Sequence, residues 1–274
     1  MTIDQIDYAS KIVKHFGQEN CKPVTTPLPG GYKPQICDEQ ATKENISLYQ
    51  SIIGSLLYLT LGTRPDIAYA VILMSQFMVN PSEEHIKKAL YIVKYVKSML
   101  NVKITYNGRN KEGLIAFADA DWAADVASQK SVTGNVVKLA GGPVSWVSRK
   151  QKTIALSSTE AEYMSLSDTA RQLIWIQSIY HELGFKVHGI ELNIDNQGAI
   201  FLAQNQMQEH RSKHIDIRYH YVRECIEDGK IVLIYIPTNQ QAADILTKNL
   251  AYVKFQELRS SIGVQVYQQG GVSK

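Results

Sequence analysis

Four acidic side chains stand where elements of secondary structure are expected to end or begin: Asp119, Glu162, Asp195 and Asp244. Asp119 and Asp195 each close an apolar strand-like segment, Glu162 lies near the start of a long helix-like segment, and Asp244 lies in the first turn of the last one. Side chains at strand ends converge in α/β sheets. Converging carboxylates repel one another unless a cation or a proton neutralises them, and oxygen ligands without Cys or His select Mg²⁺ or Mn²⁺. The pattern predicts a site for two Mg²⁺ ions, with Mn²⁺ as the alternative, suited to phosphodiester hydrolysis.

Helical register separates Glu162 from its neighbour Glu160. An apolar stripe runs through Leu166, Ala170 and Leu173, and Glu162 lies one turn before it on the same face. Glu160 lies roughly 160–200° further around the helix. We therefore expect Glu162 to face the sheet and Glu160 to face solvent. Taken singly, each of these acidic residues is more often an ordinary turn or helix-dipole residue.

The elements that must position these residues form an α/β layer in the second part of the chain. Apolar alternation and apolar runs predict strands at 114–119, 132–139, 144–152, 190–195 and 231–236. Helical spacing predicts helices at 157–183, 196–203, 211–227 and 240–248. The order of these elements indicates an α/β sandwich with a mixed sheet. The continuous apolar run 231–236 is typical of a strand buried on both faces.

The front part of the chain reads as all-helical. Amphipathic or apolar helices are expected at 4–16, 49–62, 67–79 and 82–100, with a Pro- and Gly-rich linker at about 22–45. We divide the chain into a helical segment at 1–104, an α/β domain at 105–250 and a C-terminal tail at 251–274. The front helices need a partner surface, so they either pack on one another or leave an apolar patch exposed.

The composition is that of an ordinary globular protein. The 274 residues are 45% hydrophobic and 20% charged, which is typical of globular chains. The net charge of +3 is too small to indicate a polyanion-binding protein by itself. Three widely spaced cysteines offer no zinc site and favour a reducing, intracellular setting. The polar N-terminus is unlike a signal peptide, and no apolar run is long enough to span a membrane.

Five motifs in the second part occur in an order that resembles the ribonuclease H domain of copia-type (Ty/copia, Pseudoviridae-like) retrotransposons. They are Phe117-Ala-Asp-Ala-Asp-Trp-Ala123, Ser157-Ser-Thr-Glu-Ala-Glu-Tyr163, Ile194-Asp-Asn-Gln197, Lys213-His-Ile-Asp-Ile-Arg-Tyr-His-Tyr-Val-Arg-Glu224 and Ala242-Ala-Asp-Ile-Leu-Thr-Lys248. The front part resembles the thumb and connection of a copia-type reverse transcriptase. Its motifs are Glu19-Asn-Cys-Lys-Pro23, Tyr49-Gln-Ser-Ile-Ile-Gly54, Gly62-Thr-Arg-Pro-Asp66 and Ser75-Gln-Phe77.

This resemblance implies a ribonuclease H-like fold, with a mixed five-stranded sheet flanked by helices, behind a small all-α segment. It implies endonucleolytic hydrolysis of the RNA strand of RNA–DNA hybrids, with the four acidic residues as catalytic groups and metal ligands. The residues expected on the substrate side are Asp121, Ser158, Thr159, Asn196, Gln197, Arg211, His214 and Arg218. The expected partners are the hybrid and the remainder of a reverse transcriptase. The expected compartment is cytoplasmic, in a virus-like particle, with the nucleus as the alternative.

Other interpretations remain open at this stage. No Tyr-x-Asp-Asp element occurs, so no polymerase active site is expected in this chain, and the loop 237–243 lacks the histidine that cellular ribonucleases H carry there. The chain could instead be a catalytically inactive, retroelement-derived protein that binds nucleic acid or a partner. A DNA-cutting relative of the same fold, an integrase or resolvase, is a further alternative. Ser158 is equally a helix N-cap candidate, and the basic stripe at 211–218 is equally a solvated helix face.

Overall fold

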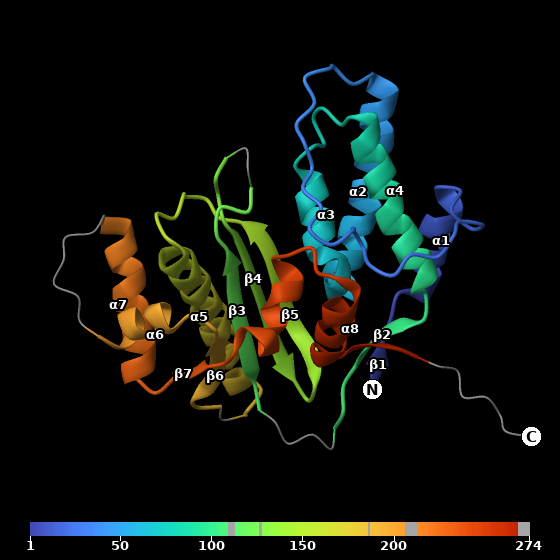
Figure 1. Cartoon of the computed structure of the whole chain (residues 1–274). Helices are drawn as coiled ribbons and strands as arrows, with labels where there is room; N and C mark the ends of the chain where they lie inside the picture. The colour runs from blue at the N-terminus through green and yellow to red at the C-terminus, as the bar shows by residue number, and fades with distance from the viewer. Residues whose placement is uncertain (109–112, 126–127, 186, 206–212, 268–274) are drawn as a thin grey trace, which may run out of the picture. The chain divides into compact units, whose positions relative to one another are not determined.

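The computed structural model describes residues 1–108, 113–125, 128–185, 187–205 and 213–267, and for residues 213–217 it describes the backbone only. The chain divides into two compact units (Figure 1). The first unit comprises Met1–Tyr106 together with Lys248–Lys274, and the second comprises Asn107–Thr247. Among the described residues, no helix has the length and apolar character needed to cross a membrane.

The second unit is built on a mixed five-stranded sheet, as expected, in the order β5-β4-β3-β6-β7. The strands are β3 (Ile115–Asp121), β4 (Val132–Leu139), β5 (Gly142–Lys150), β6 (Ile190–Ile194) and β7 (Ile231–Tyr235). β4 pairs antiparallel with both β3 and β5, whereas β6 pairs parallel with both β3 and β7. A tight turn joins β4 to β5 through Ala140 and Gly141, whose φ angles of 50° and 81° suit a two-residue hairpin.

One strand differs from its sequence-based prediction. β7 was expected to be buried on both faces, but it is an edge strand in which Val232 is 44% exposed and Tyr235 is 48% exposed. The apolar run of β7 therefore reflects β propensity on an edge strand rather than a central position in the sheet.

Helices cover this sheet and close its core. They are α5 (Ser158–Glu182), α6 (Gln197–Gln204) and α7 (Lys213–Glu227). α5 packs on β3 and β4, and α6 and α7 pack on α5. The small side chains of Ala116 and Ala118 on β3 let α5 approach the sheet closely, and they are fully buried with Leu166 and Leu173 of α5. The predicted apolar stripe of α5 is thus the face that contacts the sheet.

The segment after β7 is not the single helix expected at 240–248. It forms two short 3₁₀ helices, η2 (Thr238–Gln240) and η3 (Ala242–Leu246). Gln241 lies between them and is fully buried, and its side-chain amide donates to the carbonyl of Ala118 on β3 at 2.9 Å. This bond holds the start of η3 against the sheet.

η3 approaches the sheet so closely that β4 needs a glycine there. A Cβ atom added at Gly134 would lie 2.6 Å from Cγ2 of Thr247 and 3.0 Å from Cβ of Leu246. Since Gly134 pairs with Asp119 across the strands, this close approach also sets the surroundings of Asp119.

Three arginines, from β5, α5 and α7, pair with one carboxylate. Arg149 of β5, Arg171 of α5 and Arg218 of α7 all pair with Asp168 of α5. Burial of Asp168 by itself would raise its pKa, but the hydrogen bond from Arg149 and the positive charges of the three guanidinium groups outweigh burial and hold the pKa below its ordinary value. Asp168 therefore links β5, α5 and α7 as a charged carboxylate.

The first unit contains the front helices packed on one another. They are α1 (Ile6–His15), α2 (Lys43–Gly62), the 3₁₀ helix η1 (Pro65–Ile67), α3 (Ala68–Ser75) and α4 (Glu83–Ser98). Ile52, Leu56 and Leu59 of α2 are fully buried, as are Val71 of α3 and Val93 of α4. Of the two expected arrangements, the small bundle is the one that the apolar stripes adopt. The unit also contains a three-stranded antiparallel sheet of β1 (Thr2–Ile3), β2 (Val102–Thr105) and β8 (Val264–Val266).

The expected C-terminal tail is instead part of this first unit. Residues 252–261 form α8 (Tyr252–Ser261), and β8 then pairs with β2. A buried polar network anchors α8: Arg259 donates to the hydroxyl of Tyr95 at 3.2 Å, and that hydroxyl donates to Asp66 at 2.8 Å. Asp66 also pairs with Arg64 at 2.9 Å. The sequence gives little sign of this docking because α8 has a weak amphipathic pattern and its partners lie more than 150 residues away.

Replacing Gly134 should destabilise the second unit. We expect Gly134→Ala to lower the free energy of unfolding by about 1–3 kcal/mol, because the new methyl group overlaps η3. Urea unfolding followed by circular dichroism measures this change, with Gly108→Ala as the matched control because its Cβ would meet no atom within 4 Å. Equal stability of the two variants would contradict the close packing of η3.

Removing the charge of Asp168 should loosen the helical layer in a pH-dependent manner. At neutral pH, Asp168→Asn should lower the free energy of unfolding by about 1 kcal/mol, a modest figure because solvent screens the exposed arginines. Because the folded-state pKa is depressed, the contribution is present above the ordinary carboxyl pKa and is lost as pH falls through the folded value. The stabilities of the wild type and the variant should therefore converge below about pH 4. A constant difference across the pH range would rule out this charge effect.

Candidate metal centre

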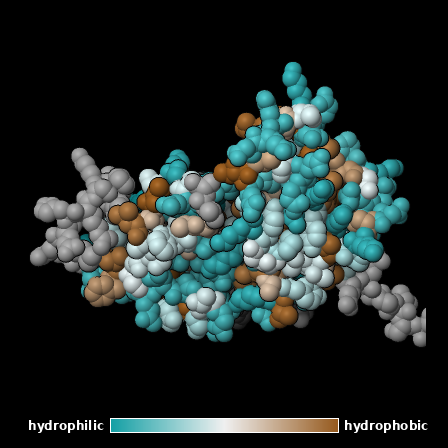
Figure 2. Space-filling view, turned by 45° about the horizontal axis from the view of Figure 1, so that its top comes forward, coloured by the Kyte–Doolittle hydropathy of each residue, from teal (hydrophilic) through white to brown (hydrophobic). Residues whose placement is uncertain are grey.

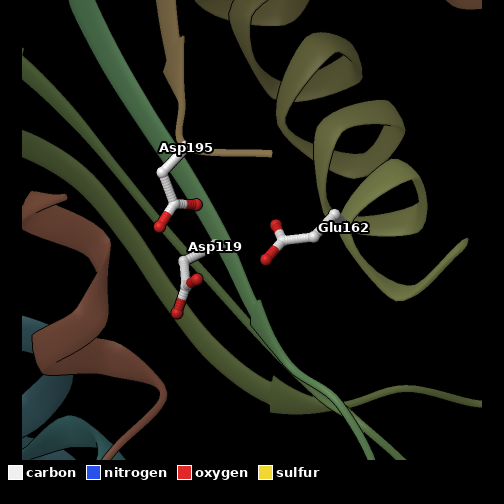
Figure 3. A group of neighbouring side chains, drawn as sticks. All are labelled: Asp119, Glu162 and Asp195. Carbon is white, nitrogen blue, oxygen red and sulfur yellow. The ribbon is translucent and has the colours of Figure 1, made fainter. Parts of the chain in front are cut away.

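Three carboxylates meet in the second unit near the carboxyl ends of β3 and β6. Asp119, Glu162 and Asp195 each place one oxygen within 4.8 Å of the others, and their side chains point toward one another (Figure 3). Asp119 is 1% exposed and Glu162 is 7% exposed, whereas Asp195 is half-buried. The cluster therefore has a closed side, formed by the sheet and α5, and a more accessible side at Asp195.

The parallel pairing of β3 and β6 brings two of these residues together. Phe117 lies opposite Asn193 in the parallel register, and continuing this register by two residues places Asp119 beside Asp195. Asp119 lies near the carboxyl end of β3, and Asp195 directly follows β6. The carboxyl ends of parallel strands share an edge of the sheet, which is where sites form in α/β folds.

The start of α5 supplies the third carboxylate. Ser157 is the N-cap, and its hydroxyl accepts from the backbone N–H of Glu160 at 3.1 Å. Glu160 turns back so that its carboxylate accepts from the N–H of Leu156 at 2.9 Å. Glu162, two residues further on, faces the sheet, in the orientation that helical periodicity predicts. The two glutamates therefore have different tasks: Glu160 caps the helix, and Glu162 joins the cluster.

Asp119 is fixed from two directions. Its carbonyl oxygen accepts from the hydroxyl of Ser165 on α5 at 2.8 Å, and its carboxylate accepts from the hydroxyl of Thr247, directly after η3. Thr247 also donates to the carbonyl of Asp244 at 3.3 Å. Ser165 and Thr247 were not singled out from the sequence, although Thr247 lies inside one of the motifs. A threonine is an ordinary residue after a helix, so its type alone gave no signal.

Asp244 is not one of the three clustered carboxylates. It lies in η3 and is 4% exposed. Its link to the cluster runs through Thr247, which bonds both to the Asp244 carbonyl and to the Asp119 carboxylate. The structure thus brings three of the four predicted acidic residues together and places the fourth in the adjoining segment.

The substrate-side residues predicted near the cluster lie at the starts of α5 and α6. Asn196 is the N-cap of α6, accepting from the N–H of Ala199 at 2.9 Å, and Gln197 follows it, exposed. Thr159 lies against α6, since its side chain would be 3.1 Å from a Cβ atom at Gly198. Ser158 is exposed, and the neighbouring Ser157 serves as the cap instead. Asp121, the last residue of β3, is half-buried beyond the three clustered carboxylates.

The basic residues predicted for substrate binding are described only in part. Arg211 lies outside the described residues, and His214 lies in α7, where the structure describes only the backbone. Arg218 is half-buried, with its guanidinium on Asp168 and on the carbonyl of Met164 at 3.3 Å. The structure therefore places Arg218 in contact between α7 and α5.

The donor set of the cluster fits a hard divalent cation. Three carboxylates from three separate elements converge at this point, and two of the three residues are buried. Like charges at this spacing raise one another's energy, and a bound cation relieves that repulsion. The cluster is thus an acidic site that could hold a metal ion.

The comparisons with known proteins find relatives of this chain among the Pol polyproteins of transposons. The chain is 36% identical over 268 residues to the retrovirus-related Pol polyprotein from transposon TNT 1-94 of Nicotiana tabacum. It is 39% identical over 264 residues to that from transposon RE1 of Arabidopsis thaliana. Each match includes 96% of this chain but only 20% and 18% of the relatives, so the chain spans about a fifth of their length.

The chain was also compared with family models and with solved structures. No family model matches the chain. A crystal structure of LC11-RNase H1 in complex with RNA/DNA hybrid aligns with 49% of this chain and 93% of its own, at a TM-score of 0.35 and 16% identity.

The matches to both relatives cover 96% of this chain. The chain therefore belongs to the copia-type family of retrovirus-related Pol polyproteins.

Proposed function

We propose that this chain hydrolyses the RNA strand of RNA–DNA hybrids, as the ribonuclease H part of a copia-type polyprotein. The proposal rests on the cluster of Asp119, Glu162 and Asp195, which lies where the carboxyl ends of β3 and β6 meet the start of α5. We further propose two Mg²⁺ ions as its cofactors, with Mn²⁺ as a substitute. When bound, such ions activate water and stabilise the leaving oxygen of a phosphodiester.

The roles of the acidic residues follow from their positions. Asp119, held by Ser165 and Thr247, is the fixed ligand, because neither its backbone nor its carboxylate needs to reorganise when substrate arrives. Glu162 and Asp195 complete the three-sided oxygen set from α5 and β6. Asp244 is proposed as the fourth acidic residue, acting from η3, which the bonds of Thr247 hold next to Asp119.

The exposed starts of α5 and α6 are proposed to contact the substrate. Ser158, Thr159 and Gln197 carry hydroxyl and amide groups that can bond to ribose 2′-hydroxyls in the minor groove of a hybrid. These groups distinguish the RNA strand from the DNA strand. Asn196 positions Gln197 by capping α6. Asp121 stands at the substrate side, and Arg211, His214 and Arg218 are proposed to provide a basic face toward phosphates.

A cleavage assay tests the proposal directly. Labelled RNA–DNA hybrid, double-stranded RNA and double-stranded DNA are each incubated with the full chain in Mg²⁺ and in EDTA. We expect cutting of the hybrid's RNA strand in Mg²⁺ alone. Binding of the hybrid without cutting would overturn the enzymatic proposal in favour of an inactive, nucleic-acid-binding protein, and cutting of DNA would favour a DNA-cutting relative.

Removing one carboxylate should abolish activity without unfolding the protein. We expect Asp195→Asn to eliminate Mg²⁺-dependent cleavage, because an anionic ligand is lost. In EDTA its thermal stability should equal or exceed that of the wild type, since repulsion in the cluster is relieved. Glu191→Gln is the matched control because Glu191 is an exposed residue of the same strand, β6. Cleavage by Asp195→Asn at the wild-type rate would refute the assignment.

The two glutamates of α5 should respond differently to the same change. Glu162→Gln should reduce the cleavage rate by orders of magnitude, whereas Glu160→Gln should retain it and lose about 0.3–1 kcal/mol of stability at the helix N-terminus. Single-turnover rates and thermal melts of the two variants, measured side by side, separate the roles. A greater loss of rate in Glu160→Gln would show that the cluster assignment is wrong.

A further inference from the structure

Three large apolar side chains are exposed on two segments that adjoin the carboxylate cluster. They are Trp122, Ile154 and Leu156, with exposed fractions of 50%, 52% and 85%. The indole N–H of Trp122 donates to the carbonyl of Ala155, between the other two, at 3.1 Å. We call these three residues the apolar rim. On the face of the molecule in Figure 2, exposed apolar side chains lie in separate patches among hydrophilic ones.

The backbone beneath the apolar rim is held in place. Ala155 is 3% exposed and packs with Ala120, Ala161 and Met164. Gln151, at the start of the same segment, is buried and donates to the carbonyl of Ala161 at 3.0 Å. At its end, the N–H of Leu156 bonds to Glu160. Because Ala155 points inward, Ile154 and Leu156 are directed outward, and this exposure is fixed by packing rather than produced by a loose loop.

The position of the apolar rim relates it to the cleavage site. Trp122 follows Asp119 by three residues, a reach of at most about 10 Å along the chain. Ala155 packs with Ala120, the residue next to Asp119, and Leu156 directly precedes the cap of α5. A duplex whose scissile phosphate lies at the cluster would therefore pass the rim within a few base pairs of that phosphate.

The chemistry around the apolar rim favours nucleic acid as the occupant. Lys152 is exposed two residues before Ile154 and has no ion pair among the residues described. A cation beside apolar groups suits a duplex edge, where phosphates alternate with the carbon faces of sugars. An A-form-like hybrid presents these sugars in a wide, shallow minor groove, whereas the minor groove of B-DNA is only about 6 Å wide.

We propose that the apolar rim of Trp122, Ile154 and Leu156 packs against the sugars of the hybrid's minor groove and thereby discriminates an A-form-like hybrid from duplex DNA. This inference rests on the proposed function, because it takes the hybrid as the substrate. It assigns a shape-reading role to residues that carry no charge and that lie outside the acidic cluster. Trp122 and Leu156 are the central contacts, and Lys152 supplies the neighbouring contact to phosphate.

Binding measured without cleavage tests the role of the apolar rim. Fluorescence anisotropy in EDTA gives the Kd of the full chain for a labelled hybrid and for DNA of the same sequence, at low and at moderate salt. We expect Leu156→Ser to weaken hybrid binding by about tenfold and to leave DNA binding unchanged. The loss should be the same at both salt concentrations, because an apolar contact releases no counterions, whereas Lys152→Ala should weaken both duplexes and flatten the salt dependence.

Matched variants keep this test decisive. Leu156 is 85% exposed, so its replacement leaves the packed segment intact, and Leu183→Ser, an exposed leucine just after α5, is the control expected to bind like the wild type. A second readout is the fluorescence emission of Trp122, measured in a Trp146→Phe/Trp175→Phe protein in which it is the remaining tryptophan. Addition of hybrid should change this emission, and addition of DNA should not. Three outcomes would each overturn the proposal. They are an equal loss of affinity of Leu156→Ser for both duplexes, unchanged hybrid binding by Leu156→Ser, and a wild type that binds no hybrid.

The same measurements separate the apolar rim from the proposed activity. If the wild type binds hybrid and Leu156→Ser binds it less well, but no cleavage occurs in Mg²⁺, the rim stands and the enzymatic proposal fails. If cleavage is intact and Leu156→Ser binds hybrid as the wild type does, the activity stands and the rim fails.

Discussion

The packing of the second unit must hold three carboxylates within 4.8 Å of one another, and this is the constraint that the rest of the unit has to meet. A chain gains nothing in stability by bringing Asp119, Glu162 and Asp195 together without a cation, so the surrounding packing must supply the free energy. That free energy comes from contacts that do not involve the acidic side chains. β3 and β6 pair through their backbones, α5 buries an alanine- and leucine-lined face, and the acidic side chains sit at the edge of that contact.

Asp119 shows how this constraint is met at a single residue. Its neighbour across the strands, Gly134, has no side chain, and this lets η3 approach until Thr247 reaches the Asp119 carboxylate. The buried side chain of Gln241 holds η3 in that position by its bond to Ala118. A glycine, a glutamine and a threonine, none of them acidic, thereby determine the surroundings of the acidic residue. Their contribution is positional.

The first unit meets a different requirement, which is to bury helices whose apolar faces would otherwise be exposed. α2, α3 and α4 bury their stripes against one another, and α8 returns from the far end of the chain to complete the unit. The buried pair of Arg64 and Asp66, extended by Tyr95 to Arg259, satisfies charged groups that would be costly to bury alone. Arg64 and Asp66 belong to one of the motifs that identified the front part, so that motif has a structural function here.

The sequence by itself determined the elements that have strong local signals. The periodicity of α5 predicted both its length and the inward orientation of Glu162, because burial of one face imposes a regular spacing. Alternation predicted β6 to within a residue, and the bounds predicted for β4 agree with the structure. The joint order of the motifs indicated the family, and the acidic residue types predicted a cluster of four, of which the structure brings three together.

Only the tertiary structure decided the features that depend on contacts between distant segments. Whether β7 is central or at the edge is a matter of sheet order, which an apolar run does not encode. The docking of α8 and β8 on the first unit, the bond of Thr247 to Asp119, and the three arginines on Asp168 each join residues far apart in sequence, where local patterns carry no information. The same reason applies to Trp122: its residue type fits a core equally well, and the structure leaves it 50% exposed with its indole N–H bonded to the carbonyl of Ala155.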